Sequence, residues 1–548
     1  MAVSFSEGRE QVSGQDATVA TTNSTDIATP GLRAATLRPG AERKTMKKIV
    51  LIEPRSPDYH IFSRYHLPRL GNLILGAILE QAGHYVKVFV EDMTEIDFKA
   101  VFEADLVGIS TITSTAPRAY ELARQIKKHG VPVVLGGPHV TYLAEEALDY
   151  ADYVMRGEAE NSILPFMEAL EKKQGLGDVP GLSFRVGNQC FHNPAAERCP
   201  DLDTLPFPDF SLLRSPIGTI RPVLTSRGCP HDCSFCSVTN MFGRAYRFRS
   251  KENVLRELRA IDPKQVIFFY DDNFAANRRR TKELLELMIE EKIAPRWTAQ
   301  VRCDVTKDRE LMELFRRANC YYVYVGIESV NPESLAAFNK KLTVEEIEES
   351  IKVFHEYGIR VHGMFVLGSD EDTVATLRQT ASFAKRNAID TVQFMILTPL
   401  PGSKQYDNMV AENRLLTHDW GLYDAHHVVF QPKLMSPLEL QVENFRALRS
   451  FYSISHILKG ISKLDLIGVF LKAYAHRLER HWTARNRHYQ DVVKQMRTDA
   501  ADRVNLTLAK TREDITRRIQ DFKDRNAALL AKEKKAKPEP DGLPAPRS

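Results

Sequence analysis

The chain has 548 residues, of which 43% are hydrophobic and 27% are charged, an ordinary composition for a protein of two or three globular domains. A formal net charge of +4 is small for this length, and no basic stripe interleaved with aromatic residues stands out. Nucleic acid is therefore not an expected partner.

The first 45 residues are rich in Ser, Thr, Ala and Gly, without the apolar core of a secretory signal. No run in the chain approaches the roughly 20 apolar residues of a membrane span. We therefore expect residues 1–45 to be a disordered tail, with a start at Met46 left open, and the protein to be cytoplasmic. The chain has seven cysteines, and three of them lie close together, which fits a reducing compartment and one metal site rather than a disulfide framework.

Strands and helices alternate in the first folded segment, residues 46–172. Apolar runs predict its strands at residues 48–52, 84–90, 105–110 and 131–137. Such alternation predicts an α/β fold with a doubly wound, Rossmann-like parallel sheet, whose ligands lie beyond the carboxyl ends of the strands. Ser110, Gly136 and Gly137 lie at these ends.

A second alternating block is expected over residues 218–410, after a linker segment over 173–217 that is rich in proline and glycine. Its six candidate strands lie at residues 223–226, 265–270, 297–301, 322–326, 361–367 and 391–397. Six strands separated by helices fit a partial (β/α)6 TIM-like barrel. A helical C-terminal domain over 411–498 and a charged tail over 499–548 complete the predicted organisation.

Three cysteines lie in one loop directly after the first predicted barrel strand: Cys229, Cys233 and Cys236. A [4Fe–4S] cube needs four ligands, so three thiolates leave one iron open for a small molecule, as an enzymatic cluster requires. A zinc site would use a fourth Cys or His. His231 is available, but paired ligand knuckles are absent, so the pattern favours the iron–sulfur cluster.

This loop resembles that of the radical S-adenosylmethionine (radical SAM) superfamily, whose CxxxCxxC motif opens a six-stranded partial barrel. Phe235 matches the aromatic residue usually found just before the third cysteine. The resemblance implies that the open iron binds S-adenosylmethionine and that the reduced cluster cleaves it to a 5′-deoxyadenosyl radical. It also implies an external electron donor such as a flavodoxin or ferredoxin.

Other positions match cofactor-binding landmarks of that superfamily. Asp271 and Asp272 follow a strand where the family holds the methionine moiety, although loop acids also serve as helix caps. Glu328 stands in a GxES-like strand end, where the acid meets the cofactor's ribose or amino group. Arg302 is a candidate partner for a cofactor carboxylate, with a structural salt bridge as the alternative. Residues 398–402 resemble the end of the sixth strand near adenine, or form a simple turn.

A doubly wound domain ahead of such a barrel resembles the cobalamin-binding class of radical SAM enzymes. That class includes methylases of unactivated carbon and phosphorus and the anaerobic oxidative cyclase of chlorophyll synthesis. The resemblance covers about residues 46–455 and implies cobalamin beside Ser110, Gly136 and Gly137, because glycine lets a large flat ligand approach the backbone closely.

The chain departs from the DxHxxG motif of domains that bind cobalt through histidine. Asp58 and His60 match the motif, but Ser63 replaces its glycine. Many radical SAM relatives have no histidine ligand, so we expect His60 to be an ordinary loop histidine rather than the cobalt ligand.

Two features of the C-terminal region leave alternatives open. Residues 420–430 form either a lid, with Tyr423 or His426 facing the substrate, or a packed turn that enters a helix capped by Ser436. Residues 454–482 have the pattern of a basic amphipathic helix, which either covers a core or makes a peripheral contact with an anionic membrane.

The leading functional hypothesis is cobalamin-dependent methylation of an unactivated carbon on a small-molecule or lipid-like substrate. An oxidative cyclase or carbon–carbon bond-forming enzyme acting on a lipid or tetrapyrrole is the first alternative, and a non-catalytic corrinoid-binding module is the second. A methylthiotransferase is disfavoured, because Cys190 and Cys199 cannot supply a second three-cysteine cluster.

Overall fold

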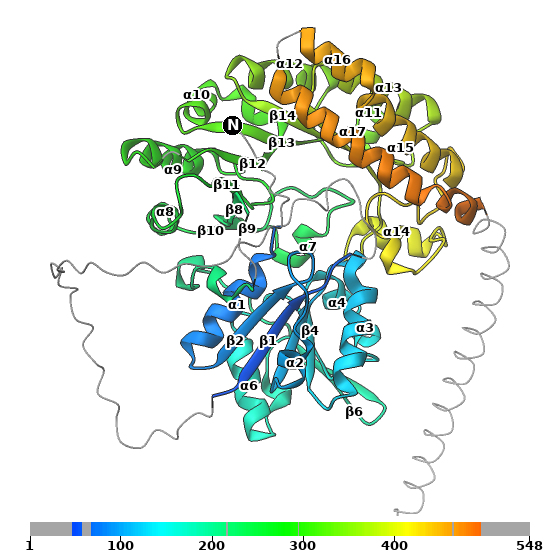
Figure 1. Cartoon of the computed structure of the whole chain (residues 1–548). Helices are drawn as coiled ribbons and strands as arrows, with labels where there is room; N and C mark the ends of the chain where they lie inside the picture. Colours follow the sequence, from blue (N-terminus) through cyan, green and yellow to red (C-terminus); the bar gives the residue numbers. More distant parts are fainter. Residues whose placement is uncertain (1–45, 57–66, 215–217, 294, 463–464, 495–548) are drawn as a thin grey trace, which may run out of the picture. The chain divides into compact units, whose positions relative to one another are not determined.

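The computed structural model describes residues 46–56, 67–214, 218–293, 295–462 and 465–494 (Figure 1). The expectations for residues 1–45, for His60 and for residues 499–548 lie outside the described residues. Among the helices in the described ranges, none is both long and apolar enough to cross a membrane.

The first sheet has seven strands in the order β2-β1-β3-β4-β5-β6-β7. Its first five strands are parallel: β1 (Lys48–Glu53), β2 (Tyr85–Val90), β3 (Leu106–Ser110), β4 (Val133–Gly136) and β5 (Tyr153–Met155). Ile49 and Leu51 pack on the side of α1 (Leu70–Gln81) and α6 (Ile163–Lys172), whereas Val50 and Ile52 pack on the side of α3 (Ala116–Lys127). Because both faces of the sheet are covered by helices, the predicted doubly wound fold is confirmed.

The predicted linker over residues 173–217 differs from the structure. Within it, β6 (Leu182–Val186) and β7 (Gln189–His192) form a hairpin that pairs antiparallel with β5. The two-residue Gly187–Asn188 connection, with Gly187 at φ +59°, is the signal that the sequence offered for this hairpin. The first sheet therefore extends twenty residues beyond the boundary expected at residue 172.

The second sheet confirms the six-stranded partial barrel. Its strands are all parallel, in the order β15-β14-β13-β12-β11-β8. From one edge to the other they are β8 (Ile220–Val223), β11 (Val266–Phe269), β12 (Trp297–Val301), β13 (Cys320–Glu328), β14 (Arg360–Leu367) and β15 (Thr391–Ile396). Strand β8 ends at Val223, where the sequence analysis expected the strand to begin. It contains Pro222, which is tolerated because β8 lies at the edge of the sheet.

Helices cover the outer face of the barrel sheet: α8 (Lys251–Arg259), α9 (Arg278–Glu290), α10 (Arg309–Arg317), α12 (Val344–Glu356) and α13 (Val374–Arg386) (Figure 1). Trp297 is fully buried under them, with its ring centroid 5.1 Å from that of Phe315 and 5.4 Å from those of Phe269 and Phe274. Edge-to-face and tilted aromatic pairs of this kind fill the core between the sheet and these helices.

The C-terminal helices are α14 (Lys404–Ala411), α15 (Pro437–Phe451), α16 (Ile454–Ser462) and α17 (Leu466–Asn486). Ser436 caps α15 in a capping box with Glu439, as the sequence indicated. At the other end of α15, the Tyr452 hydroxyl donates to the carbonyl of Val392 at 2.7 Å and accepts from its amide at 3.0 Å. The region is thereby attached to strand β15.

Residues 420–430 form the packed turn rather than the lid. Trp420, Tyr423 and Val429 belong to the core beneath the first sheet, and the Trp420 indole donates to Glu146 Oε1 at 2.8 Å. Tyr423 and His426 are buried, and the Tyr423 hydroxyl donates to the carbonyl of Thr417 at 2.7 Å. Neither side chain lies where it could face a substrate from a lid.

Candidate functional site

The cysteine loop begins with a sharp backbone turn at Gly228. This residue has φ +87°, and a Cβ there would lie 2.7 Å from the carbonyl oxygen of Ala245 and 2.9 Å from that of Gly243. Only glycine fits such a position. The turn follows β9 (Ser226–Arg227), which pairs with β10 (Arg247–Phe248), and it places Cys229 at the carboxyl end of the barrel sheet.

The three cysteine side chains are half-buried and form no disulfide. Burial raises the pKa of all three thiols, to about 12 at Cys236, so the thiolates need a nearby cation. Among the described residues, no set of three or more His, Cys, Asp or Glu side chains converges as the ligands of a single metal ion do. In a cubane cluster each thiolate binds a different iron, so the three cysteines need not converge on one atom.

Contacts from distant parts of the chain fix the cysteine loop. Lys404 pairs with Asp232 at 2.8 Å, and the amide of Gln405 donates to the carbonyl of Ser234 at 3.0 Å. The Asn339 side chain donates to the carbonyl of Asp232 at 3.1 Å. A loop held from both sides presents its ligands in one arrangement, which favours binding of a preformed cluster.

Asp271 and Asp272 have different surroundings, although they are neighbours in the sequence. Asp271 is fully buried and accepts hydrogen bonds from the Thr225 amide at 3.2 Å, the Thr225 hydroxyl at 3.1 Å and the Ser226 hydroxyl. Burial raises its pKa, and the Ser226 bond and the charge of Arg280 oppose that shift. Asp271 therefore holds the turn that leads into the cysteine loop.

The Asp272 side chain is exposed, yet the surrounding protein raises its pKa to about 7 by desolvation, with a smaller effect of the charge on Asp271. Its charge in turn raises the pKa of the Cys229 and Cys236 thiols, so it lies close to the cysteine loop. An accessible carboxyl group close to the cysteines is suited to bind the amino group of a ligand.

Glu328 and Lys340 form a buried ion pair next to the cysteines, with 2.8 Å between Oε1 and Nζ. Glu328 has φ +67°, a costly conformation for a glutamate. A Cβ on Gly326 would lie 2.7 Å from Glu328 Oε1, so the glycine makes room for this carboxylate. The charge of Lys340 lowers the pKa of the Cys233 thiol and that of Glu328 raises it. Lys340 has no motif of its own, and the sequence did not reveal it.

Arg302 and Phe235 also reach this group of residues. The charge of Arg302 lowers the pKa of the Cys229 and Cys233 thiols, and its Nε lies 3.3 Å from Asp304 Oδ1. The structural salt bridge considered for Arg302 is thus present. The Phe235 ring packs edge-on against Phe338, with 5.1 Å between centroids, and anchors the loop to the barrel core.

The carboxyl edge of the first sheet carries the residues expected to face cobalamin. Ser110 accepts a hydrogen bond on its carbonyl from Arg69 at 3.0 Å. Gly137 has φ +101°, and a Cβ there would lie 2.3 Å from the carbonyl oxygen of Thr111, so its role is close backbone packing. A Cβ on Gly136 meets only Met155 O, at 3.8 Å, and Ile112 is 38% exposed beside it. Open backbone next to an exposed apolar side chain fits a large flat ligand.

Four side chains, each at most 11% exposed, join the residues after β5 to the β9–β10 strand pair. We call them the Arg–Glu quartet: Glu158, Glu160, Arg227 and Arg247. Arg227 Nη2 lies 2.6 Å from Glu160 Oε1, and Arg247 Nη1 lies 2.9 Å from Glu158 Oε2. Arg227 Nη1 also lies 3.3 Å from Glu158 Oε2. The two glutamates follow β5, and Arg227 precedes Gly228. The quartet therefore connects the cysteine loop to the carboxyl edge of the first sheet.

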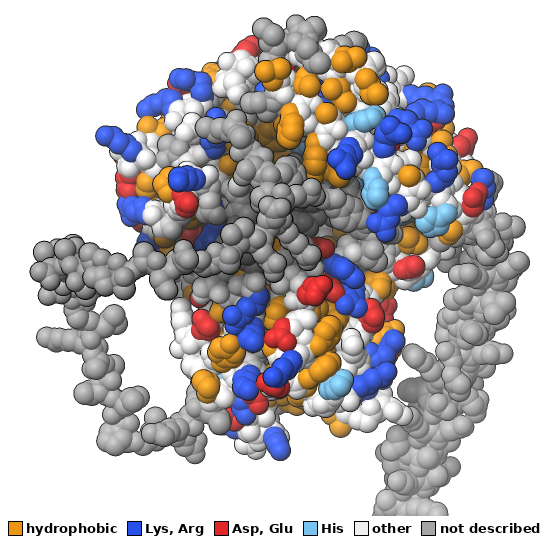
Figure 2. Space-filling model, in the orientation of Figure 1, with side chains coloured by type: hydrophobic (Ala, Val, Ile, Leu, Met, Phe, Trp, Pro, Cys, Tyr) orange, Lys and Arg blue, Asp and Glu red, His pale blue; other side chains and the backbone are white. Residues whose placement is uncertain are grey.

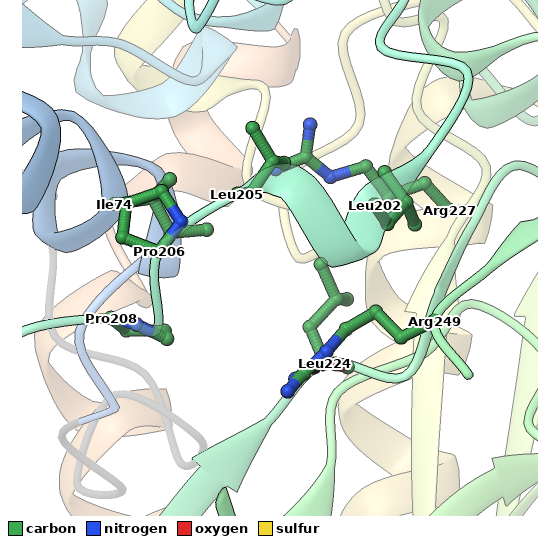
Figure 3. A pocket seen from close by; sticks show the side chains of 8 residues that line it. All are labelled: Ile74, Leu202, Leu205, Pro206, Pro208, Leu224, Arg227 and Arg249. Atoms are coloured by element: carbon green, nitrogen blue, oxygen red, sulfur yellow. Dashed lines mark hydrogen bonds between the residues drawn. The ribbon is translucent and has the colours of Figure 1, made fainter. Parts of the chain in front are cut away.

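A small, open pocket lies beside the quartet, and Figure 3 shows its lining side chains. Six of these are apolar and two are arginines: Ile74, Leu202, Leu205, Pro206, Pro208, Leu224, Arg227 and Arg249. Arg249 is engaged by Glu257 and by the carbonyl of Leu224. No residue predicted to bind a cofactor lines this pocket, so it is distinct from the site around the cysteines.

Comparison with known proteins agrees with this geometry. The radical SAM superfamily model matches residues 223–384, and the B12 binding domain model matches residues 62–164. An uncharacterized methyltransferase of Pyrococcus horikoshii is 31% identical over 431 residues, which make up 75% of this chain and 93% of that protein. The chain belongs to the radical SAM enzymes with a B12-binding domain.

A second relative resembles the chain in sequence, and a solved structure resembles it in fold. Bacteriochlorophyllide d C-12(1)-methyltransferase of Chlorobaculum tepidum is 31% identical over 445 residues, covering 79% of this chain and 93% of that protein. The structure of the radical SAM methyltransferase TsrM from Kitasatospora setae, with cobalamin and a [4Fe–4S] cluster bound, has a TM-score of 0.61 at 16% identity. The match covers 83% of this chain and 100% of the TsrM chain, and it shows that the two proteins share a fold.

Membership in this family confirms the enzyme class and cofactors implied by the sequence. The chain is a radical SAM enzyme that reductively cleaves S-adenosylmethionine, and its cofactors are a [4Fe–4S] cluster, S-adenosylmethionine and cobalamin.

Proposed function

We propose that this enzyme is a cobalamin-dependent methyltransferase that acts on an unactivated carbon of a small, largely apolar molecule. The observation that carries the proposal is the Arg–Glu quartet, which ties the cysteine loop to the carboxyl edge of the B12-binding sheet. Methyl transfer needs the two cofactors to act on one substrate, and a buried ionic connection between their sites supports such an arrangement. The related methyltransferases support the same reaction.

In this proposal, Cys229, Cys233 and Cys236 bind three irons of the cluster. When bound, the cluster supplies one electron to the sulfonium of S-adenosylmethionine, and cobalamin supplies a methyl group. Asp272 binds the amino group of the cofactor, and Glu328, oriented by Lys340, accepts a hydrogen bond from its ribose or amino group.

The remaining cofactor assignments concern Arg302, Phe235 and the first sheet. Arg302 faces the cofactor's carboxylate in the proposed site, and Phe235 keeps the third cysteine in place. Ser110, Gly136 and Gly137 form the proposed cobalamin edge, with Gly136 providing the open backbone. We further propose that a reduced flavodoxin or ferredoxin in the cytoplasm supplies the electron.

The inner face of the barrel sheet supports an apolar substrate. Val323 and Val325 point into the helix-covered core, so the alternate residues Tyr322 and Tyr324 lie on the opposite, inner face. The Tyr324 ring centroid lies 5.6 Å from that of Phe268 and 5.0 Å from that of His362. A half-buried aromatic wall favours ring-containing or lipid-like substrates, and the bacteriochlorophyllide acted on by one relative is a substrate of this kind.

The test uses protein purified without oxygen and reconstituted with iron, sulfide and cobalamin. It is then given S-adenosylmethionine, a reductant and candidate tetrapyrroles or lipids. Formation of both 5′-deoxyadenosine and S-adenosylhomocysteine is expected for methylation. Formation of 5′-deoxyadenosine without S-adenosylhomocysteine would contradict methylation and favour the cyclase alternative.

Two controls separate the parts of the proposal. Cys233→Ala is expected to abolish cleavage of S-adenosylmethionine, whereas Cys190→Ala, at the half-buried cysteine of β7, is expected to leave it unchanged. A reconstituted protein without corrin absorbance would remove cobalamin from the proposed reaction.

A further inference from the structure

The hairpin of α16 and α17 carries a cluster of exposed apolar side chains. Its large hydrophobic members are Ile454 (60% exposed), Leu458 (55%), Leu466 (70%), Phe470 (65%) and Tyr474 (37%). Within each helix they follow one another at intervals of four residues, so those of one helix lie on one face of that helix. Figure 2 shows hydrophobic side chains gathered over this part of the molecule. We call these five residues the apolar stripe.

The same exposed face becomes basic further along α17. Its exposed ionisable residues in this part are Arg477, Arg480, His481 and Arg485. The acidic residue of α17, Glu479, is only 1% exposed and accepts a hydrogen bond from the Thr483 hydroxyl at 2.8 Å. The exposed face of α17 thus combines an apolar half with a positive half and carries no exposed acid within the helix.

We propose that the α16–α17 hairpin docks this enzyme on the surface of an anionic membrane. The apolar stripe enters the boundary between headgroups and acyl chains, and the arginines face lipid phosphates. The helices lie on the membrane rather than cross it, because no described helix is apolar enough to span. The inference goes beyond the proposed methyl transfer and does not depend on it.

Charge favours a membrane over a second copy of the chain as the occupant of this face. A symmetric contact between two copies would bring the same face together twice, and with it the arginines of both α17 helices. Like charges oppose such a contact, whereas anionic lipids attract the arginines and leave the stripe to be buried in the acyl boundary.

The test is flotation of the full-length holoenzyme with lipid vesicles. Vesicles of phosphatidylglycerol and phosphatidylcholine are expected to bind the enzyme, and vesicles of phosphatidylcholine alone to bind it more weakly. The double variant Leu466→Ser, Phe470→Ser is expected to weaken binding at least tenfold. Arg477→Gln and Arg480→Gln are each expected to weaken it about fivefold, with the difference lost at high salt.

A matched control is Phe191→Ser, which removes a 39%-exposed aromatic ring from β7, outside the hairpin, and is expected to leave binding unchanged. Cleavage of S-adenosylmethionine with a small reductant is expected to be equal in the wild type and in all these variants. Equal cleavage would show that the variants keep the fold. Equal flotation of the Leu466→Ser, Phe470→Ser variant and the wild type would overturn the proposal. Failure of the wild-type enzyme to float with any vesicle would also overturn the proposal. The same holds if a hairpin variant dissociates a dimer in sedimentation but floats like the wild type.

Discussion

Arg227 and Glu160 form a buried ion pair, with 2.6 Å between Nη2 and Oε1, across 67 positions of the chain. Arg227 stands two residues before Cys229, and Glu160 follows β5, the last parallel strand of the first sheet. Both side chains are less than 9% exposed. The arrangement of the cysteine loop therefore depends on a residue of the B12-binding domain.

Glu160→Gln is expected to lower the free energy of unfolding by about 3 kcal/mol, because it leaves the buried Arg227 with less compensating charge. The variant is also expected to hold less iron after reconstitution. Chemical unfolding measures the first effect and iron analysis the second. Glu443→Gln is the matched control. Glu443 pairs with Arg378 at 2.7 Å and with Arg446 at 2.5 Å. Both arginines are more than half exposed, so a loss below about 1 kcal/mol and full iron content are expected. Equal effects of the two variants would contradict the role given to the quartet.

Gly326→Ala is expected to displace the Glu328 carboxylate, since the new Cβ would lie 2.7 Å from Oε1. The cluster should still assemble, but the affinity for S-adenosylmethionine should fall at least tenfold, as measured by the cofactor-induced change in the cluster's paramagnetic resonance spectrum. Gly71→Ala serves as the control, because a Cβ at that helical position meets nothing within 4 Å. An unchanged affinity in Gly326→Ala would remove Glu328 from the cofactor site.

The neighbouring aspartates allow the same chemical change at two positions with different expected results. Asp271→Asn should lower stability by roughly 2 kcal/mol and reduce retention of iron, because it weakens the bonds to Thr225 and Ser226. Asp272→Asn should retain the fold and the iron but weaken binding of S-adenosylmethionine. Iron analysis and cofactor titration distinguish the variants, and a reversed pattern would exchange the two roles.

His362 predicts a loss of stability in acid. Burial lowers its pKa to about 4, below the usual 6.5, although a hydrogen bond with Gln393 opposes the shift. Between pH 6.5 and pH 4, His362 binds a proton in the unfolded chain but not in the folded protein. The free energy of unfolding should therefore fall by about 3 kcal/mol as the pH drops from 6.5 to 4. His362→Gln should remove this part of the slope in urea unfolding, whereas His481→Gln, exposed on α17, should not. Parallel pH profiles for wild type and His362→Gln would contradict this account.

The parts of the fold that follow from local patterns could be predicted from the sequence. The barrel strands alternate core-facing residues such as Val323 and Val325 with others, and the three cysteines lie within one loop. The β6–β7 hairpin was missed because its strands are short and largely exposed, and only the Gly187–Asn188 turn marked them.

The missing parts of the candidate site depend on contacts between distant segments. Lys340 acquires its importance only where the chain folds back onto Glu328, and Glu160 only where it meets Arg227. Asp271 and Asp272 are the same residue type side by side. Only their tertiary surroundings distinguish the buried one, which holds a turn, from the accessible one beside the cysteines.

The Trp420 indole that donates to Glu146 has a consequence for how this protein is made. These two residues are 274 positions apart, so the core beneath the first sheet still lacks a large side chain when that sheet leaves the ribosome. At about 5–20 residues per second, the gap lasts on the order of tens of seconds. During that interval the core of the nascent first domain lacks Trp420, Tyr423 and Val429, so it becomes fully packed only after all the barrel strands have been synthesised.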